Sequence, residues 1–255
     1  ANDRVDFDLY PGEVHALLGE NGAGKTTLMR ILYGMYEQDA GIISLDGQKV
    51  NIHSPARAIQ LGIGMVHQHF MLVPSLSVTE NIALGLPSSK GPLLDLDYVA
   101  ERSKALSESY RLGIESDAVV WQLSVGEQQR VEILKALYRD ASVLILDEPT
   151  AVLTPQEVTD LFNTLRQMTS QGLSSIFISH KLHEVLDISD RITVLRDGSV
   201  VQSLRTSETN KRELARLMVG REILLRVERQ PVEAGSVRLS IEDLWVEGDK
   251  GLPAV

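Results

Sequence analysis

Short apolar runs alternate with segments of helical periodicity along most of the chain. Apolar runs bounded by polar or turn residues predict strands at 13–19, 63–67, 143–147, 174–179 and 191–195. Apolar residues at helical spacing predict helices at 26–34, 55–61, 124–138, 155–169 and 181–187. Because strands and helices alternate, we expect an α/β fold in which a mainly parallel sheet is flanked by helices on both faces.

Two segments depart from this alternation. Residues 41–50 have apolar positions on both sides of Asp46-Gly47, a dipeptide typical of two-residue hairpin turns. Residues 76–112 are predicted to be mostly helical, with a break rich in Pro, Ser and Gly at 87–92. We therefore expect an antiparallel β subdomain and a helical subdomain that spans about 76–138.

The last part of the chain has a different pattern. Gly220 is predicted to end the last helix, and the charged residues 221–236 resemble a linker. Alternating apolar residues at 237–241 then predict a new strand. We expect one domain at 1–220, a linker, and the start of a second domain at 237–255.

Composition narrows the class of protein. Lys and Arg number 25 against 35 Asp and Glu, a net charge of −10 that repels the nucleic-acid backbone and anionic lipid. The absence of cysteine excludes disulfides, thiolate zinc sites and cysteine nucleophiles in this chain. No apolar run reaches the ~18–20 residues that cross a bilayer, so a membrane role is expected to come through a partner. The chain starts at Ala1 in mid-strand sequence, as a piece of a longer protein would.

A glycine-rich turn followed by a lysine comes after the first predicted strand. Gly19-Glu-Asn-Gly-Ala-Gly24-Lys25-Thr26 matches G-x-x-x-x-G-K-[ST] between a strand and a helix, the context that this phosphate-binding motif requires. Backbone N–H groups and the helix dipole would hold phosphate oxygens, Lys25 would pair with the β- and γ-phosphates, and Thr26 would offer its hydroxyl to Mg²⁺. A flexible turn that happens to precede a lysine is the alternative. The predicted nucleotide-binding residues are Gly19, Glu20, Asn21, Gly22, Ala23, Gly24, Lys25, Thr26 and Thr27.

Two acids, Asp147 and Glu148, end the apolar run that begins at Val143. Open α/β sheets bind ligands at the carboxyl ends of their strands. One acid could hold a metal ion and the other could orient a water molecule. A buried strand followed by a solvated acidic turn is the alternative when the run is considered alone.

The run Leu123-Ser-Val-Gly-Glu-Gln-Gln-Arg130 lies at the start of a predicted helix. Ser124 is predicted to be its N-cap, with Glu127 as the capping-box partner. The exposed N-terminus of this helix could also bind an anion. Gln68 and His180 each follow a predicted strand and would be ordinary loop residues if considered singly.

Residues 13–203 resemble ATP-binding cassette ATPases. The resemblance rests on five elements that occur in this order: the phosphate loop, Gln68, the Leu123–Arg130 run, the two acids and His180. The resemblance implies a P-loop nucleoside triphosphatase fold with an antiparallel β subdomain and a helical subdomain. It also implies ATP and Mg²⁺ as cofactors and the hydrolysis of ATP as the activity.

The resemblance assigns a role to each motif. Glu148 resembles the catalytic carboxylate, expected to contribute ~10²–10⁴-fold, and His180 resembles the histidine that contacts the γ-phosphate. Gln68 resembles the glutamine that contacts Mg²⁺ or the attacking water, and Thr26 and Asp147 would be the other metal ligands. Two such cassettes face each other, and the signature of one acts in trans on the nucleotide of the other. That signature is Leu123, Ser124, Val125, Gly126, Glu127 and Gln128.

Three features set the chain apart from the general cassette pattern. Val125 replaces a glycine, and Ala151-Val-Leu-Thr154 replaces Ser-Ala-Leu-Asp, as in the simple-sugar and nucleoside importer branch. Two cassettes are fused in that branch, so this chain resembles the N-terminal cassette, and 237–255 would begin a second, truncated one. The aromatic residue that stacks on adenine would lie upstream of Ala1, since Tyr10 is too close to the phosphate loop. We expect weaker ATP binding than in an N-terminally extended chain.

The resemblance therefore implies an ATP-hydrolysing subunit that energises import of a nucleoside or a simple sugar. The expected partners are a second cassette, membrane permease subunits and, indirectly, a substrate-binding lipoprotein, but not nucleic acid. The expected location is peripheral, at the cytoplasmic face of the cell membrane. The segment 67–81 is most similar to nucleoside-uptake ATPases, and ribose- or galactose-type uptake is the second choice.

The same sequence features argue against other functions. A soluble cassette ATPase acting on DNA would carry a long coiled-coil insertion, for which the segment between Gln68 and Leu123 is too short. One acting on ribosomes would carry basic extensions. A small-molecule kinase or GTPase sharing only the phosphate loop is disfavoured by the signature, and a non-hydrolysing module by Asp147 and Glu148.

Overall fold

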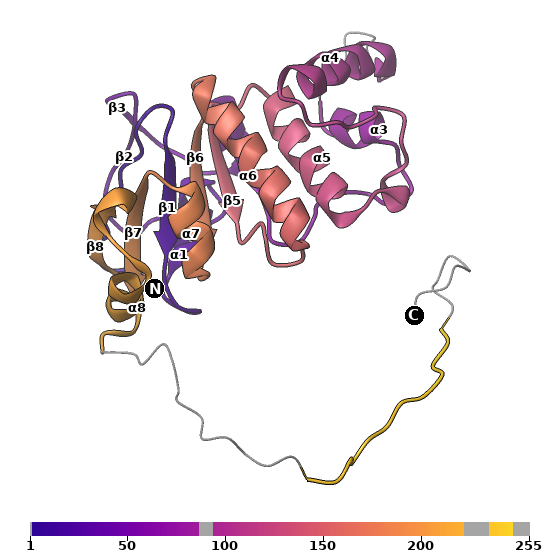
Figure 1. The fold of residues 1–255 in the computed structure, drawn as a ribbon. Coiled ribbons are helices and arrows are strands. Elements are labelled where there is room, and N and C mark those ends of the chain that lie inside the picture. The colour runs from indigo at the N-terminus through magenta and orange to yellow at the C-terminus, as the bar shows by residue number, and fades with distance from the viewer. Residues whose placement is uncertain (1, 87–93, 222–234, 247–255) are drawn as a thin grey trace. The chain divides into compact units, whose positions relative to one another are not determined.

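The computed structural model describes residues 2–86, 94–221 and 235–246. The chain divides into two units, Ala1–Ile223 and Leu224–Val255. All helices and strands of the described ranges lie in the first unit (Figure 1). None of these helices has both the length and the apolar composition needed to cross a bilayer.

A six-stranded sheet forms the centre of the first unit, in the order β4-β5-β6-β1-β7-β8. All neighbouring strands are parallel except β7 and β8. The strands are β1 Val14–Leu18, β4 Ile63–Val66, β5 Val143–Asp147, β6 Ser174–Ser179, β7 Arg191–Arg196 and β8 Ser199–Arg205. The expected mainly parallel sheet is confirmed, and β8 is an additional strand that follows the tight turn at Asp197-Gly198.

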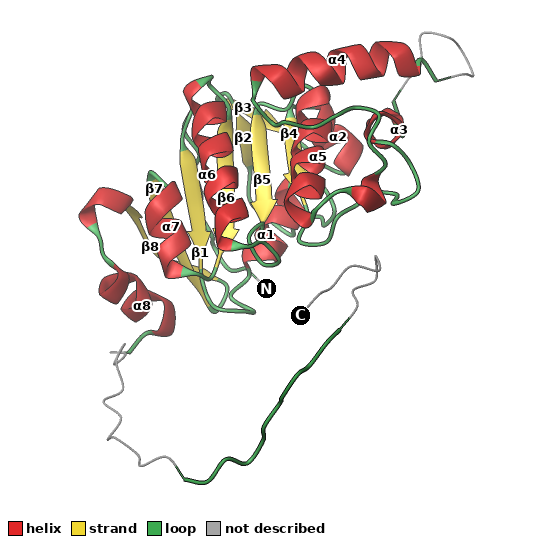
Figure 2. Ribbon diagram, turned by 45° about the vertical axis from the view of Figure 1, so that its right-hand side comes forward, coloured by secondary structure: helices red, strands yellow, loops and turns green. Residues whose placement is uncertain are grey.

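Helices cover both faces of the sheet (Figure 2). One face packs against α1 Lys25–Leu32 and α2 Pro55–Gln60. The other packs against α5 Val125–Tyr138, α6 Pro155–Ser170, α7 Leu182–Ile188 and α8 Lys211–Val219. Strand β5 contributes to both cores, because Ile145 faces the α1 side while Leu144 and Leu146 face the α5 side. A strand buried on both faces explains why its sequence is an unbroken apolar run.

The expected antiparallel β subdomain is the hairpin of β2 Ile43–Leu45 and β3 Gln48–Val50. Asp46 and Gly47 form its turn, with φ of 51° and 76°. Positive φ at both central residues is the conformation for which this dipeptide is favoured.

The expected helical subdomain contains α3 Val78–Ala83, α4 Leu96–Ser109, a short 3₁₀ helix at Val120–Gln122 and α5. Side chains of these helices share one apolar core with β4, β5 and α6. The break predicted at 87–92 lies outside the described residues.

The strand predicted at 237–241 is wrong. The described residues 235–246 form no strand, and Val237, Leu239 and Ile241 are exposed. Alternating apolar residues form a stable strand only with a neighbouring strand and an apolar surface to cover one face, and within its described part this segment has neither. The linker predicted at 221–236 lies almost entirely outside the described residues, so the division into domains stays a prediction.

Candidate functional site

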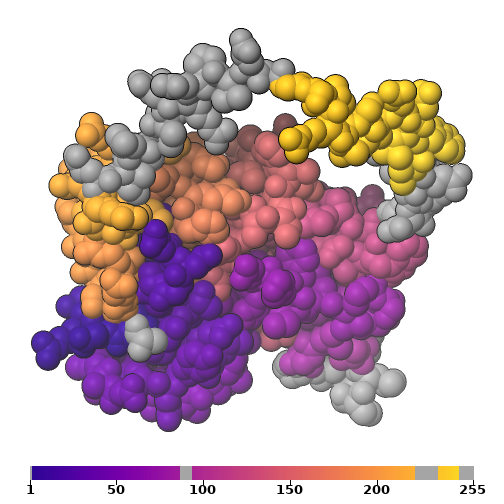
Figure 3. All heavy atoms as spheres, turned by 90° about the horizontal axis from the view of Figure 1, so that it is seen from below, coloured from indigo at the N-terminus to yellow at the C-terminus, as the bar shows by residue number. Residues whose placement is uncertain are grey.

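Most of the predicted site residues lie at one edge of the sheet. The phosphate loop follows β1, Gln68 follows β4, Asp147 and Glu148 end β5, and His180 follows β6. These four strands are parallel neighbours, so their carboxyl ends point in the same direction. Figure 3 views the molecule from this side, where early segments (purple) adjoin segments from the middle of the chain (pink).

The phosphate loop is a compact turn between β1 and α1. A Cβ added at Gly19 would lie 2.4 Å from the Leu195 carbonyl oxygen, so a side chain would not fit there. Gly22 and Gly24 have φ of 86° and 100°, which glycine adopts without strain. No side chain caps the N-terminus of α1. Its free N–H groups and the positive end of its dipole therefore remain available to an anion.

Lys25 lies beneath the loop. Its Nζ donates hydrogen bonds to the carbonyl oxygens of Gly19, at 2.7 Å, and Glu20, at 3.0 Å. Burial lowers the pKa of Lys25, although the charges of Glu148 and Asp147 act in the opposite direction. The ammonium group is thus held in a poorly solvated place, where its attraction for a phosphate is strong.

Thr26 and Asp147 form a possible metal site. The Thr26 hydroxyl donates to Asp147 Oδ1 at 3.3 Å, and Asp147 is 5% exposed. Burial raises the pKa of Asp147, while the hydrogen bond from Thr26 partly offsets this. A hydroxyl and a carboxylate are oxygen ligands that suit Mg²⁺, which usually takes phosphates and waters as its remaining ligands. No cluster of three or more acidic or histidine side chains suited to a metal occurs in the described ranges.

Glu148 and His180 contact each other across neighbouring strand ends. His180 Nδ1 lies 3.0 Å from Glu148 Oε1. The backbone of Glu148 is left-handed, with φ of 47°, and its N–H donates to the Ile178 carbonyl oxygen at 3.1 Å. Such a conformation is costly for a residue other than glycine and is often found at functional sites. It turns the chain sharply after β5.

Gln68 is exposed, and no hydrogen bond is formed by its side chain within the described residues. It lies two residues after the end of β4, beside the strand that carries Asp147. The structure therefore places it at the same edge as the acids, without a direct contact to them.

The signature residues lie on α5 and on the residues that precede it. Ser124 is the N-cap, with the predicted capping box: its Oγ accepts from Glu127 N at 3.3 Å, and Glu127 Oε2 accepts from Ser124 N at 2.7 Å. Gln128 Nε2 donates to the Leu123 carbonyl oxygen at 3.0 Å. Val125 is exposed. Within the described residues, no hydrogen bond joins the signature to this chain's own phosphate loop.

The start of α5 is instead attached to α6. The Gly126 N–H donates to Glu157 Oε1 at 3.1 Å, and a Cβ at Gly126 would lie 2.7 Å from that oxygen. Glu157 also completes the capping box of Thr154 at the start of α6. Gly126 is therefore needed for the close approach of the two helix starts.

A buried contact between α5 and the acidic turn was not predicted from the sequence. Gln129 is 1% exposed, and its Nε2 donates to the Pro149 carbonyl oxygen at 2.9 Å. Helical spacing could have indicated its burial, because Gln129 shares one face of α5 with Ile133.

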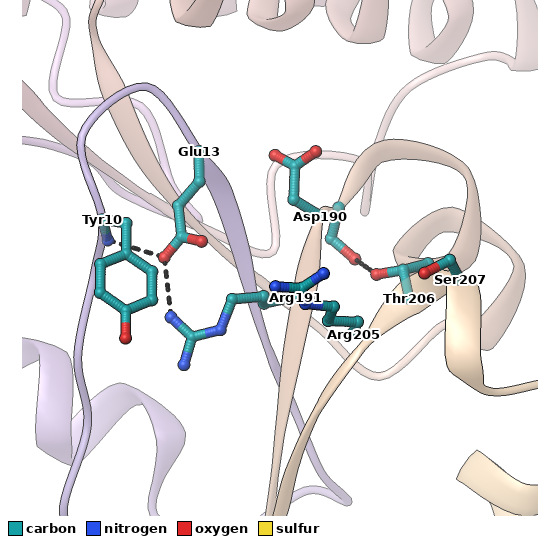
Figure 4. A pocket seen from close by; sticks show the side chains of 8 residues that line it. Tyr10, Glu13, Asp190, Arg191, Arg205, Thr206 and Ser207 are labelled. Atoms are coloured by element: carbon teal, nitrogen blue, oxygen red, sulfur yellow. Dashed lines mark hydrogen bonds and ion pairs between the residues drawn. The ribbon is translucent and has the colours of Figure 1, made fainter.

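A separate cavity of about 690 Å³ lies at the opposite edge of the sheet (Figure 4). Arg191 is its central side chain, paired with Asp8 at 2.9 Å and Glu13 at 3.2 Å and stacked over Tyr10. Arg191 lowers the pKa of Asp8. Arg191 is thus already paired with two carboxylates. Tyr10 lies four residues before β1, at the opposite end of that strand from the phosphate loop.

Together, the sheet order, the phosphate loop and the two consecutive acids Asp147 and Glu148 define a P-loop nucleoside triphosphatase fold and site. The model of the ABC transporter family matches residues 2–151. The chain therefore belongs to the ABC transporter family, as an ATP-binding cassette.

Relatives at the sequence level carry import names. The chain is 47% identical to the glucose import ATP-binding protein TsgD13 of Haloferax volcanii, with 100% of this chain and 52% of that protein covered. It is 46% identical to the guanosine import ATP-binding protein NupO of Bacillus subtilis, with 100% and 50% covered. The chain thus spans about half the length of the relatives it matches.

Solved structures agree with the fold. An ATP-binding cassette in its ADP conformation, MJ1267, has a TM-score of 0.74 at 25% identity, with 87% of this chain and 93% of that one covered. CbiO1 from Clostridium perfringens, part of an ABC transporter complex, has a TM-score of 0.70 at 29% identity, with 82% and 83% covered.

Proposed function

We propose that this chain binds and hydrolyses ATP and that the hydrolysis energises import through a membrane permease. The observation that supports this most strongly is the convergence of Lys25, Asp147, Glu148 and His180 at the carboxyl ends of three adjacent strands. Backbone N–H groups of residues 19–27 and the Lys25 ammonium group would hold the β- and γ-phosphates.

In this proposal Glu148 accepts a proton from the attacking water and orients it. His180, 3.0 Å from the Glu148 carboxylate, keeps that carboxylate in place and contacts the γ-phosphate. Gln68 contacts the water or the metal from the end of β4. Thr26 and Asp147 would hold Mg²⁺, which would neutralise phosphate charge when bound.

The exposed start of α5 is proposed to act on a second cassette. Ser124 and the free N–H groups of the helix would contact the γ-phosphate bound by the facing partner. Two observations support an action in trans: the signature makes no hydrogen bond to its own phosphate loop in the described part of the chain, and Val125 and Trp121 beside it are exposed. The second cassette is proposed to be fused in the natural protein, as the half-length match to relatives suggests.

A groove beside Gln68 is the proposed contact for the permease. A cavity of about 270 Å³ lies between α2, β4 and α5 and is lined in part by His67, Met71, Leu84 and Arg139. Met71 and Leu84 are exposed apolar side chains, of the kind that interfaces cover. Binding to a permease here would place the chain peripherally at the cytoplasmic face of the membrane, with a substrate-binding lipoprotein as an indirect partner.

The proposed cargo is a nucleoside, with a simple sugar as the second choice. Relatives of similar identity are named for glucose, guanosine and ribose import. Uptake of labelled purine nucleosides and pentoses by cells that carry the natural transporter tests this choice. Uptake of sugars alone would contradict it.

Steady-state ATP hydrolysis by the natural full-length protein, assembled with its membrane partners, tests the proposal as a whole. Lys25→Ala should weaken ATP binding and turnover together. Glu148→Gln should leave binding intact and remove turnover. Gln167→Met, a substitution near the end of α6 at a residue that bonds to Ser109 and to none of these motifs, is the control. Unchanged turnover in both Lys25→Ala and Glu148→Gln would reject the proposed site.

A further inference from the structure

The turn that follows Glu148 is fixed from two sides. On one side, Gln129 reaches from the first turns of α5 and donates to the Pro149 carbonyl oxygen at 2.9 Å. The amide is 1% exposed, so water does not compete for this bond. Pro149 directly follows Glu148, and the left-handed backbone at Glu148 leaves little freedom between them.

On the other side, the turn is bound to the segment after β6. Lys181 Nζ donates to the Thr150 carbonyl oxygen at 3.0 Å and pairs with Glu184 at 3.0 Å. The Thr150 hydroxyl donates to the same Glu184 carboxylate. Because His180 directly precedes Lys181 in the chain, the contacts of Lys181 with the turn move with His180. The Gln129 amide thus links α5 to this turn, which is otherwise bound to the segment after β6.

Helix α5 carries the signature at its tip. Ser124 caps the helix, and Gln129 lies five residues further along the same hydrogen-bonded rod. A short helical segment of this length moves as a unit, so a displacement of its tip also displaces the Gln129 amide. The Gly126–Glu157 hydrogen bond carries the start of α6 along with it.

We propose that Gln129 is a positioning residue for hydrolysis: through the Pro149 carbonyl it makes the position of Glu148 depend on the position of the signature helix. The inference rests on the proposed function, in which Ser124 acts on the nucleotide of the facing cassette and Glu148 acts on its own. Engagement of the partner's nucleotide then adjusts the carboxylate that acts in this chain's site. ATP hydrolysis at each site of a pair would therefore depend on the engagement of nucleotide at the other site.

The first test is Gln129→Met, which keeps the length and volume of the side chain and removes the N–H donor. A displacement of about 1 Å at a reacting group can cost about 10²-fold in rate, so we expect kcat for ATP to fall at least about tenfold. The KM for ATP should stay close to wild type, because the phosphate contacts are untouched, whereas the thermal midpoint should fall, because the buried Pro149 carbonyl loses its donor. The control is Gln167→Met, which removes a more exposed amide-to-carbonyl bond, to Ser109 at 2.9 Å, and should leave kcat unchanged.

The second test is a double-mutant cycle with Glu148→Gln. If Gln129 acts through Glu148, adding Gln129→Met to the Glu148→Gln variant should change the residual turnover by less than about twofold. A purely structural role would instead lower the residual turnover by the same factor as in the wild type. All variants are made in the natural full-length protein assembled with its membrane partners.

The outcomes separate this inference from the proposed function. Absence of ATP turnover in the wild type overturns both. Turnover that is equal in wild type and Gln129→Met, or that falls by the same factor in the two Glu148 backgrounds, overturns the role of Gln129 and leaves the proposed function standing. A parallel loss of kcat and thermal stability that Gln167→Met reproduces also overturns it.

Discussion

Glu148 is the residue on which the proposed chemistry depends most. Its carboxylate is within 3.0 Å of His180 and close to Lys25, whose pKa it raises against the effect of burial. We expect Glu148→Gln to lower turnover by ~10²–10⁴-fold, because the amide cannot accept the proton of the attacking water. Nucleotide binding, measured by equilibrium titration, should be retained. Turnover within about threefold of wild type would assign the general base to another group.

The buried Asp147 should make the free protein less stable at neutral pH. Its pKa is raised above the ordinary value of 3.8, mainly by burial, even with Lys25 nearby. A carboxyl group whose pKa is raised on folding stabilises the fold below its unfolded value and loses that contribution as pH rises through its folded value. Asp147→Asn should therefore raise the free energy of unfolding at pH 7.

The sign of this effect can be checked by chemical denaturation without nucleotide. The advantage of Asp147→Asn should shrink as pH falls through the raised pKa of Asp147 in the folded state, and it should vanish below the ordinary value of 3.8, where aspartic acid is protonated in both states. Asp160→Asn, at an exposed position of α6, is the control and should show no such trend. An advantage that is independent of pH would contradict the electrostatic explanation.

At the scale of elements, the starts of α5 and α6 depend on each other. An alanine at Gly126 would place its Cβ 2.7 Å from Glu157 Oε1, so Glu157 would have to leave the Thr154 cap. Loss of such a cap costs about 1 kcal/mol, and we expect Gly126→Ala to lower the free energy of unfolding by about that amount. Gly235→Ala, where the Cβ would meet no atom within 4 Å, is the control. Equal stability of the two variants would show that Glu157 relaxes freely.

At the scale of elements, sequence predicted the features that are formed by interactions between residues close in the chain. The capping box at Ser124 and the Asp46-Gly47 turn are formed by residues close in sequence, and both are present. Strand β8 and the absent strand at 237–241 depend on a partner strand. A pattern of alternating apolar residues does not indicate whether such a partner strand is available.

At the scale of the whole molecule, the signature is expected to meet nucleotide only across a pair of cassettes. The chain has no cysteine, so Ser124→Cys provides a single thiol. In a Glu148→Gln background of this 255-residue chain alone, Mg²⁺ and ATP should slow its labelling at high chain concentration, where two copies can pair. Dilution should remove this protection because pairing is lost. Labelling without nucleotide is the baseline. Protection that does not depend on chain concentration would mean that the thiol meets nucleotide within one chain.

The positions of the site residues could be predicted from sequence as far as the order and direction of the strands could be predicted. Parallel strands bring the phosphate loop, Asp147 and His180 to one edge, so an ordered set of motifs after strands predicted their proximity. Contacts that depend on side-chain direction were not predictable in this way. The Gln129 bond to Pro149 and the Arg191 network with Asp8 and Glu13 join residues far apart in sequence, and no motif marks them.

The backbone at Glu148 restricts which residues can stand there. With φ of 47°, the position accepts glycine or asparagine readily, whereas valine, isoleucine or threonine would strain the turn. Conversion of this cassette into a nucleotide trap for imaging an occluded state should therefore begin with amide or glycine replacements. In a random library at this codon, the β-branched replacements would therefore be the ones that lose stability most.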